Sequence, residues 1–266
     1  MKIWYQTATT YRYDLLWEEY GKNLEEQCKR VLRPDTELYV TGVPVAAPEP
    51  EKYKSTMYFH QSQFIKNMLR AEQEGYDAYV MGSSYDQLLE EGREMLSIPV
   101  VGIMQTNVYL AAMLGELFAI VTSEPFIAER YRQMIIRYGL QQKHLRGPYV
   151  FQISEAEMVK ALKEPEPVAK KFKAVAQKAV GDGASVLIPV PAFVSQLFYE
   201  TERLTNVDGA TILDPVAVVV KIAEMLVDLK KIGIEVSRTL QVYGSPGKEL
   251  LKKTFETYAE VFKIDY

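Results

Sequence analysis

Hydroxyl-bearing side chains follow three apolar runs of the sequence, and this placement favours the binding of an anionic oxygen. The polar residues at the ends of the three runs are Tyr5, Gln6 and Thr7; Ser83, Ser84 and Tyr85; and Thr122 and Ser123. Hydroxyl groups and the backbone N–H groups at a helix start together stabilise a carboxylate or an enolate oxygen. Serine and threonine are also common helix N-caps, so a structural role stands beside the binding role.

Side chains able to carry a proton as a base or a thiol are few. The chain has two histidines, His60 and His144, and one cysteine, Cys28. His60 follows a proline-rich stretch, residues 44–50, that is placed to fold over a cleft; a capping or surface role is its alternative. Cys28 falls on the apolar face of a predicted helix, which indicates a core position. We therefore take His60 as the candidate base and Tyr85 as a candidate weak acid.

The elements that position these groups are short β-rich runs alternating with longer amphipathic runs. This alternation is typical of βα units around parallel sheets, so the sequence predicts an α/β fold. The predicted strands cover residues 2–7, 37–43, 77–81, 100–103, 117–121, 185–190 and 210–213. The predicted helices cover residues 13–32, 55–74, 86–96, 107–114, 125–138, 155–162, 166–180, 193–204, 215–231 and 248–262.

Two buried strands indicate an internal repeat. Residues 77–83 and residues 185–191 each follow a helix that ends in glycine, and they lie 108 residues apart. Each strand ends where a βα loop begins, which is where open α/β sheets bind their ligands. Two similar halves that face each other across a cleft are therefore expected.

Composition excludes several classes of protein. With 48% hydrophobic residues and a net charge of −4, the chain has the apolar content for a core and lacks the basic excess of a nucleic-acid binder. Its apolar runs fall short of the roughly 20 residues of a membrane span, and the N-terminus lacks the apolar run of a signal peptide. One cysteine forms no internal disulfide, and no Cys/His cluster has zinc spacing. We predict a cytoplasmic protein without a metal or a membrane contact.

Five segments, in this order, resemble the aspartate/glutamate/hydantoin racemase superfamily, and its hydantoin-racemase branch in particular. They are EGYDAYVMG (residues 74–82), PVVGI (99–103), LFAIVTS (117–123), GASVLI (183–188) and TILDPVAVVVKIAE (211–224). The resemblance covers about residues 1–232. It implies two Rossmann-like lobes with parallel sheets, related by pseudo-twofold symmetry, with the active site in the cleft between them. One lobe would hold residues 1–103 plus 214–266, and the other residues 104–213.

The resemblance also implies a chemistry that this chain lacks the groups to perform. Typical members need no cofactor and are often dimers or larger, so a homo-oligomer without a cofactor is expected. They use two cysteines, one from each lobe, to remove and return the proton alpha to a carbonyl. In this chain the two positions fall on Ser83 and Pro191. A serine hydroxyl is too weakly acidic to imitate a thiolate, and proline has no ionisable group, so the two-thiol mechanism is excluded.

Other positions are carried over as candidate substrate-binding residues. Pro191 rigidifies the second-lobe loop, and the backbone N–H groups of Ala192 and Phe193 follow it at a helix start. Gln105 stands where hydantoin-branch relatives often carry a carboxylate. Residues 82–85 are also similar to the first loop of the arylmalonate decarboxylases, where hydroxyls and N–H groups hold a carboxylate or an enediolate.

The sequence therefore predicts a cofactor-independent enzyme with an oxyanion-stabilising cleft and a non-cysteine acid or base. Its substrate would be a small carboxylate, a cyclic imide or a hydantoin-like cyclic amide, and its reaction class stays open among isomerase, lyase and hydrolase. Decarboxylase- or hydrolase-type chemistry with Ser83 and Ser84 is one alternative. A catalytically silent protein that binds a small anion is the other.

Overall fold

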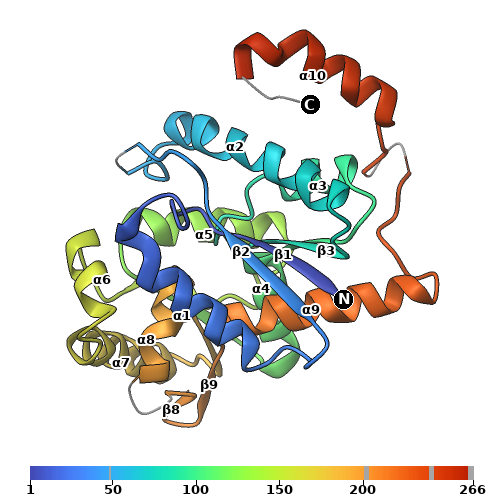
Figure 1. The fold of residues 1–266 in the computed structure, drawn as a ribbon. Helices are drawn as coiled ribbons and strands as arrows, with labels where there is room; N and C mark the ends of the chain where they lie inside the picture. Colours follow the sequence, from blue (N-terminus) through green and yellow to red (C-terminus); the bar gives the residue numbers. More distant parts are fainter. Residues whose placement is uncertain (48, 201–203, 240–242, 263–266) are drawn as a thin grey trace.

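The computed structural model describes residues 1–47, 49–200, 204–239 and 243–262, which form two α/β lobes (Figure 1). The first sheet contains β1 (Lys2–Gln6), β2 (Glu37–Thr41), β3 (Ala78–Met81) and β4 (Val100–Gly102). Its strand order is β2-β1-β3-β4, and all neighbours are parallel. The predicted α/β fold with parallel sheets is confirmed.

The second sheet repeats this order with one added strand. It contains β5 (Phe118–Thr122), β6 (Tyr149–Val150), β7 (Val186–Val190), β8 (Asn206–Val207) and β9 (Ala210–Ile212). Its order is β6-β5-β7-β9-β8, in which only β8 and β9 are antiparallel. β3 and β7 therefore occupy equivalent places, which is the repeat expected from residues 77–83 and 185–191.

Helices cover both faces of each sheet. In the first lobe, α2 (Lys54–Gln73) and α3 (Leu89–Met95) pack on one face, and α1 (Glu18–Lys29) and α9 (Pro215–Lys231) on the other. In the second lobe, α4 (Ile103–Leu114) and α5 (Pro125–Arg137) cover one face, and α7 (Glu166–Gly181) and α8 (Phe193–Glu200) the other. The remaining helices are the 3₁₀ turn η1 (Leu15–Trp17), α6 (Glu155–Ala161) and α10 (Lys248–Phe262).

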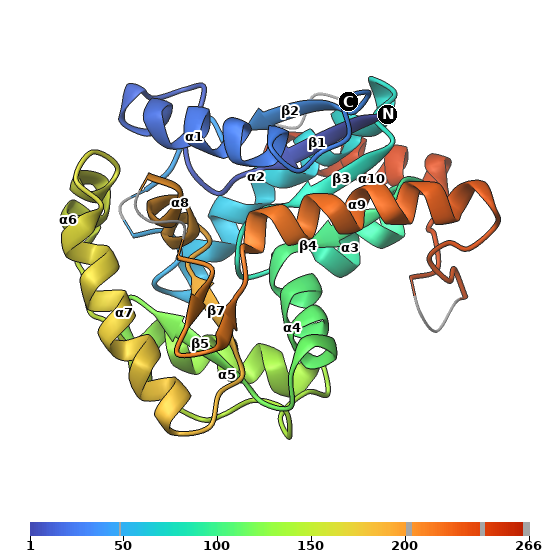
Figure 2. The same ribbon diagram turned by 90° about the horizontal axis from the view of Figure 1, so that it is seen from below.

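One hydrophobic core joins the two lobes, and each lobe also has a core of its own. Trp4, Phe64 and Tyr79 belong to the first-lobe core, beneath α2 and α3. The joint core holds Leu24 of α1 together with Phe172 of α7. Figure 2 shows α8 between α1 of the first lobe and α7 of the second, and α8 contacts both helices. Because apolar burial is the main stabilising contribution to folding, this shared core holds the cleft between the lobes in a defined shape.

Two helices cross between the lobes. α4 directly follows β4 of the first sheet yet packs on β5 and β7 of the second, whereas α9 follows β9 and packs on β3 and β4. The two crossing helices also contact each other. On these contacts we propose the lobe boundaries expected from the sequence, residues 1–103 plus 214–266 and residues 104–213.

Several element boundaries differ from the predicted ones, for local reasons. The predicted helix 13–32 is divided into η1 and α1, and the Asp14 carboxylate accepts a hydrogen bond from Leu16 N at 2.9 Å to cap the 3₁₀ turn. α4 begins four residues early because Asp86 accepts hydrogen bonds from Met104 N and Gln105 N, at 2.9 and 2.7 Å. The two-residue strands β6 and β8 are too short to show an alternating pattern. Residues 201–203 of the predicted helix 193–204 lie outside the described part.

Among the described helices, none has both the length and the apolar character needed to cross a membrane.

Candidate functional site

A pocket of about 590 Å³ opens where the two lobes meet. It is lined by residues that follow the carboxyl ends of β1, β3 and β7, and by the start of α5. Of the residues selected from the sequence, it is lined by Thr7, Ser83, Ser84, Tyr85, Pro191, Ala192 and Phe193. Strand ends of both sheets therefore meet at one site, as expected for ligand binding by parallel sheets.

Gly82 makes the floor of the pocket possible. A Cβ atom on Gly82 would lie 2.1 Å from Cε1 of Tyr5, so only glycine lets the strand end pass over this ring. Tyr5 is fully buried and does not line the pocket. Its ring supports the turn that presents Ser83 and Ser84.

The two serines face different partners. Ser83 Oγ donates a hydrogen bond to Oε1 of Glu51 at 3.3 Å. Ser84 Oγ accepts one from Ala192 N at 3.2 Å, which links the β3 loop of the first lobe to the β7 loop of the second. The Ala192 N–H group is thus engaged by Ser84, and the Val190–Pro191 peptide beside it is cis.

Glu51, which the sequence analysis did not select, lies against Ser83 in this pocket. Its side chain is half-buried and lines the pocket from the proline-rich loop before α2. Burial raises the pKa of this carboxyl to about 7, although the Ser83 hydrogen bond and the charge of Arg130 act in the opposite direction. A carboxyl group that titrates near neutrality exchanges protons readily, which is the property of a general base.

Arg130 of α5 holds the loop that carries Glu51. Its Nη2 donates to the backbone carbonyl of Lys52 at 2.6 Å, and its Nη1 donates to the backbone carbonyl of Glu51. The same guanidinium lies 5.4 Å from the centre of the Tyr85 ring. Arg130 therefore fastens a first-lobe loop to the second lobe, and within the described residues the Glu51 carboxylate has no ion-pair partner.

The lining of the pocket is acidic. Its charged groups among the described residues are Lys52 and the four carboxylates of Asp14, Glu49, Glu51 and Glu124. Lys52 Nζ is bonded to Glu49 Oε2 at 2.9 Å, so its charge is compensated. Because an excess of carboxylates repels anions, this pocket favours an uncharged ligand over an anionic one.

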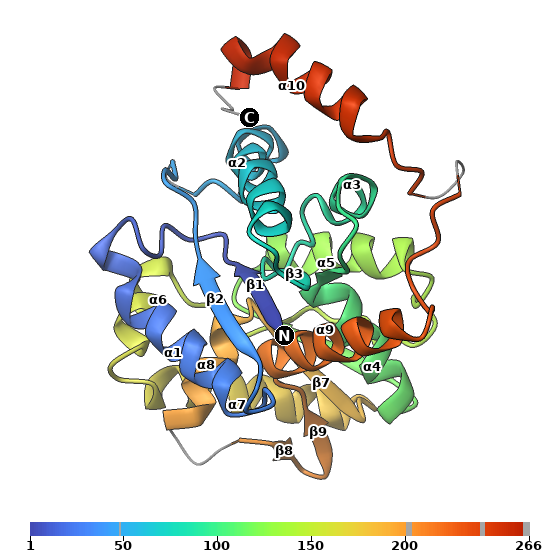
Figure 3. The ribbon, with the colours of Figure 1, turned by 45° about the vertical axis from the view of Figure 1, so that its right-hand side comes forward.

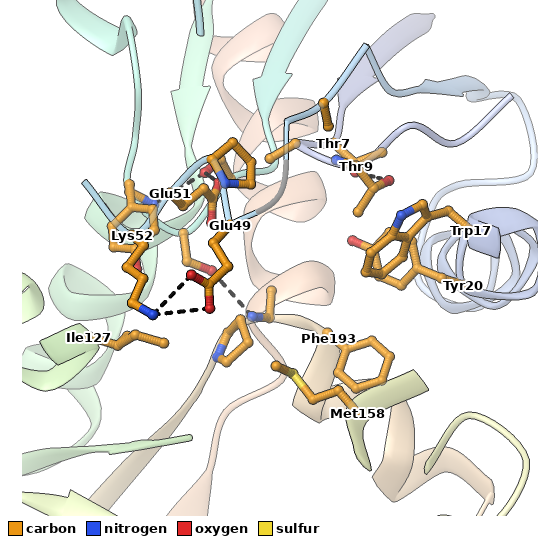
Figure 4. A pocket seen from close by; sticks show the side chains of 18 of the residues that line it. Thr7, Thr9, Trp17, Tyr20, Glu49, Glu51, Lys52, Ile127, Met158 and Phe193 are labelled. Carbon is orange, nitrogen blue, oxygen red and sulfur yellow. Dashed lines mark hydrogen bonds and ion pairs between the residues drawn. The ribbon is translucent and has the colours of Figure 1, made fainter. Parts of the chain in front are cut away.

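The wall opposite Glu51 is aromatic and apolar. Trp17 and Tyr20 of the first lobe pack at a ring separation of 5.7 Å, and Tyr20 packs on Phe193 of the second at 5.9 Å. Met158 of α6 lies beside them (Figure 4). Phe193 was selected from the sequence for its backbone N–H group, whereas Trp17, Tyr20 and Met158 were not selected; the position of the helices places all four in the pocket.

Two more of the selected residues line the pocket, and the side chain of each contacts a neighbouring residue. Thr7 Oγ1 shares a hydrogen bond of 2.8 Å with Thr9 Oγ1. The Tyr85 ring stacks on Tyr131 at 5.4 Å. Burial raises the pKa of Tyr85, so its phenol is protonated at neutral pH.

Three other selected residues do not line the pocket. His60 is 4% exposed and its Nε2 lies 2.8 Å from the carbonyl oxygen of Ala8; burial lowers its pKa. Gln6 Oε1 accepts a hydrogen bond from Asn67 Nδ2 at 2.7 Å, inside the first lobe. Gln105 Oε1 accepts one from Arg93 Nη2 at 2.6 Å. The structure does not bring these three side chains together with Ser83.

Thr122 and Ser123 are fully buried at the end of β5. Their hydroxyl oxygens have no hydrogen-bond partner within the described part of the chain, and neither residue lines the pocket. They lie at the end of β5, where the sequence analysis expected polar binding residues of the second lobe.

Neither a thiol nor a metal cluster is found at the pocket. Cys28 is buried within α1, where burial raises the pKa of its thiol, and it does not line the pocket. The described residues include no group of three or more His, Cys, Asp or Glu side chains that could hold a metal ion. The pocket's ionisable groups are therefore carboxylates, one lysine and tyrosines.

Sequence comparison identifies relatives over most of the chain. A family model described as Asp/Glu/Hydantoin racemase matches residues 18–223. The chain is 28% identical over 229 residues to a hydantoin racemase from Pseudomonas sp. (strain NS671), which covers 86% of this chain and 87% of the relative.

Solved structures with a similar fold include two allantoin racemases. The enzyme from Pseudomonas fluorescens superposes with a TM-score of 0.75 at 20% identity, covering 92% of this chain and 97% of that one. The enzyme from Klebsiella pneumoniae superposes with a TM-score of 0.72 at 19% identity, and the superposition covers 93% of this chain and 94% of that one. At this identity the likeness establishes the two-lobed fold.

Proposed function

Because the chain belongs to the Asp/Glu/hydantoin racemase family, we propose that it is an enzyme that moves the proton on the acidic ring carbon of a hydantoin- or allantoin-like cyclic amide. In such a ring the carbon that bears the substituent lies next to a carbonyl, so its proton is removed as an enolate forms. The reaction needs a base at this carbon and hydrogen-bond donors at the enolate oxygen.

The acidic lining of the pocket is the observation that supports a cyclic amide as the substrate class. Four lining carboxylates against one ion-paired lysine disfavour an amino-acid or dicarboxylate substrate, which needs a cationic group to hold its carboxylate. A hydantoin-like ring is uncharged and offers amide N–H groups that carboxylates and hydroxyls can accept. Of the three substrates considered from the sequence, the cyclic amide therefore fits best.

The aromatic wall supports a ring substrate with an apolar substituent. Trp17, Tyr20, Met158 and Phe193 form a surface on which a ring can pack, while Ser83 and Ser84 lie on the polar side. Packing against an aromatic surface orients the ring so that one face of its acidic carbon is presented to the polar side.

No cofactor is part of this proposal. The proton transfer needs only a base and a stabilised enolate, and the acid or base is a group other than cysteine, because Cys28 is buried and does not line the pocket. We also propose, from the composition of the chain, that the protein acts in the cytoplasm.

The test uses single enantiomers of allantoin and of 5-methyl-, 5-isobutyl- and 5-benzylhydantoin in D₂O. Loss of optical rotation together with deuterium at the ring carbon, both faster than in protein-free buffer, is the expected result. Consumption of a substrate with a new product would instead identify hydrolase or lyase chemistry. A rise in melting temperature without exchange or turnover would identify a silent binding protein.

We also propose that the chain forms a homo-oligomer. Large apolar side chains are more than half exposed on α2, at Tyr58 and Phe59, and on α10, at Leu250 and Val261. Exposed apolar surface of this kind is found at protein–protein contacts. Sedimentation velocity tests it, and a monomer at micromolar concentration would contradict it.

A further inference from the structure

We propose that the carboxylate of Glu51 is the base that removes the ring-carbon proton, in the place of the thiolates that this family uses; this inference rests on the function proposed above. The side chain lines the pocket, lies 3.3 Å from the hydroxyl of Ser83, and belongs to a loop that the second lobe holds through Arg130.

The location of Glu51 fits this role. Ser83 stands at the sequence position where the first thiol of the family falls, so a carboxylate bonded to its hydroxyl lies at the same end of the pocket. The aromatic wall of Trp17 and Tyr20 lies across the pocket from Glu51 (Figure 4). A ring packed on that wall would present one face of its acidic carbon toward the carboxylate.

The state of the carboxyl group also fits. Within the described residues it has no ion-pair partner, because Arg130 is bound to backbone carbonyls of the loop. Burial raises its pKa to about 7, so a large fraction is ionised at neutral pH and is basic enough to accept a proton. A fully ion-paired carboxylate would be a weaker base.

Glu49 is the competing carboxylate of the same loop. Its side chain is 56% exposed and is ion-paired with Lys52 at 2.9 Å. Solvent and the ammonium group both stabilise its ionised form, which reduces its tendency to take up a proton. The geometry therefore favours Glu51.

The proton transfer is balanced as follows. The ring C–H bond breaks, its proton forms an O–H bond with Glu51, and its electron pair moves toward the adjacent carbonyl to give an enolate. Return of the proton by Glu51 regenerates the starting enantiomer. Protonation of the other face by water gives the opposite enantiomer, and the hydroxide formed takes the proton from Glu51.

The groups that face Glu51 set the expected pH dependence. They are Ser83 and Tyr85 of the β3 loop, Arg130 and Tyr131 of α5, Tyr20 of α1, and Lys52 and Glu49 of its own loop. The basic form of Glu51 is the ionised one, so the exchange rate should rise about tenfold per pH unit below pH 7 and level off above it.

The experiment compares deuterium exchange at the ring carbon in the wild-type protein, Glu51→Gln, Glu51→Asp and Glu49→Gln. We expect Glu51→Gln to lower the exchange rate at least 100-fold, since general bases contribute roughly 10²–10⁴-fold. The pH–rate profile of this variant should also lose its inflection near pH 7. Glu51→Asp should be slowed but keep the inflection. Glu49→Gln removes a charge from the same loop, and its exchange rate should fall far less than that of Glu51→Gln.

Binding is measured separately, as the shift in melting temperature with 5-benzylhydantoin. Glu51→Gln should keep the wild-type shift, which would show that the fold and the pocket survive. Exchange by Glu51→Gln within fivefold of the wild type, or an equal loss in Glu49→Gln, would overturn the assignment. If the wild-type protein itself does not exchange any cyclic amide, the proposed function fails, and this inference fails with it.

Discussion

At the residue scale, the pocket holds Ser83 and Pro191, which were selected from the sequence, and Glu51, which was not. Ser83 and Pro191 stand where the resemblance expects cysteines, and both line the pocket from opposite lobes. The one thiol of the chain, Cys28, is fully buried within α1. The pocket thus keeps the two-sided arrangement of strand ends while its proton-carrying groups are of another kind.

A substitution at Cys28 tests whether the chemistry is free of thiols. Cys28→Ala should keep the exchange activity, because the side chain lies in the core and does not reach the pocket. The free energy of unfolding should fall by about 1 kcal/mol, for a small buried side chain replaced by a smaller one. Loss of exchange in a folded Cys28→Ala protein, measured beside urea unfolding, would contradict the proposed mechanism.

A substitution at Ser83 tests its action on Glu51. The Ser83 hydrogen bond lowers the pKa of Glu51, so Ser83→Ala should raise that pKa and move the rising limb of the pH–rate profile to higher pH. Exchange at pH 7 should fall roughly tenfold, with partial recovery at pH 9. Ser62→Ala, on α2 and away from the pocket, is the control. An equal loss at both pH values would mean that Ser83 acts without Glu51.

At the scale of elements, the site depends on a loop that one helix of the other lobe holds in place. Residues 42–47 and 49–53 belong to the connection between β2 and α2, and Arg130 of α5 binds the carbonyl oxygens of Glu51 and Lys52. Hydrogen bonds from an arginine to two successive carbonyls restrict the loop backbone and thereby the carboxylate. The β3 and β7 loops are joined separately, through Ser84 and Ala192.

Removal of this arginine should affect both the position and the pKa of Glu51. Arg130→Met loses the two carbonyl contacts and a positive charge that lowers the pKa of the carboxyl. We expect kcat for exchange to fall about tenfold or more, with the pH midpoint moved upward. Arg132→Met is the matched control, because Arg132 lies on the same helix and is ion-paired with Glu129. A fall in both variants would point to helix stability as the cause.

At the scale of the whole molecule, the two lobes are joined by a common core and by crossing helices, and α10 lies outside this body. Figure 3 shows α10 beyond α2, on the side away from the second sheet. Leu250, Tyr258 and Val261 are exposed, and Phe255, although buried, belongs to none of the three core clusters. The segment before α10 is attached through Arg238, which donates to the carbonyls of Arg93 and Leu96.

Deletion of residues 246–266 should therefore leave the fold and the exchange activity in place. The deletion keeps Arg238 and removes little core, so we expect the melting temperature to change by less than about 3 °C. If α10 contributes to an oligomer, the sedimentation coefficient falls to that of a monomer while exchange persists. Loss of exchange in the folded, truncated protein would show that α10 has a part in the site.

Much of the architecture follows from local patterns that the sequence displays. The runs ending at Thr7, Ser83 and Pro191 read as strand ends, and parallel strands deliver such ends to one edge, so their convergence was predictable. The start of α4 was not predictable from local sequence, because the Asp86 carboxylate that accepts a hydrogen bond from Met104 N lies eighteen positions earlier in the chain. His60 was selected as a rare ionisable residue, but its place on α2 turns it toward Ala8.

The sequence by itself determined the fold class, the paired halves and the absence of a thiol at either expected position, because these depend on periodicity, order and residue type. Only the tertiary structure decided which ionisable groups line the pocket, Glu51 among them. Glu51 lies in a loop without periodicity, one of 35 acidic residues, and nothing local distinguishes it. Its burial, its contact with Ser83 and its proximity to Arg130 arise when two lobes close on each other, and these long-range contacts set its pKa.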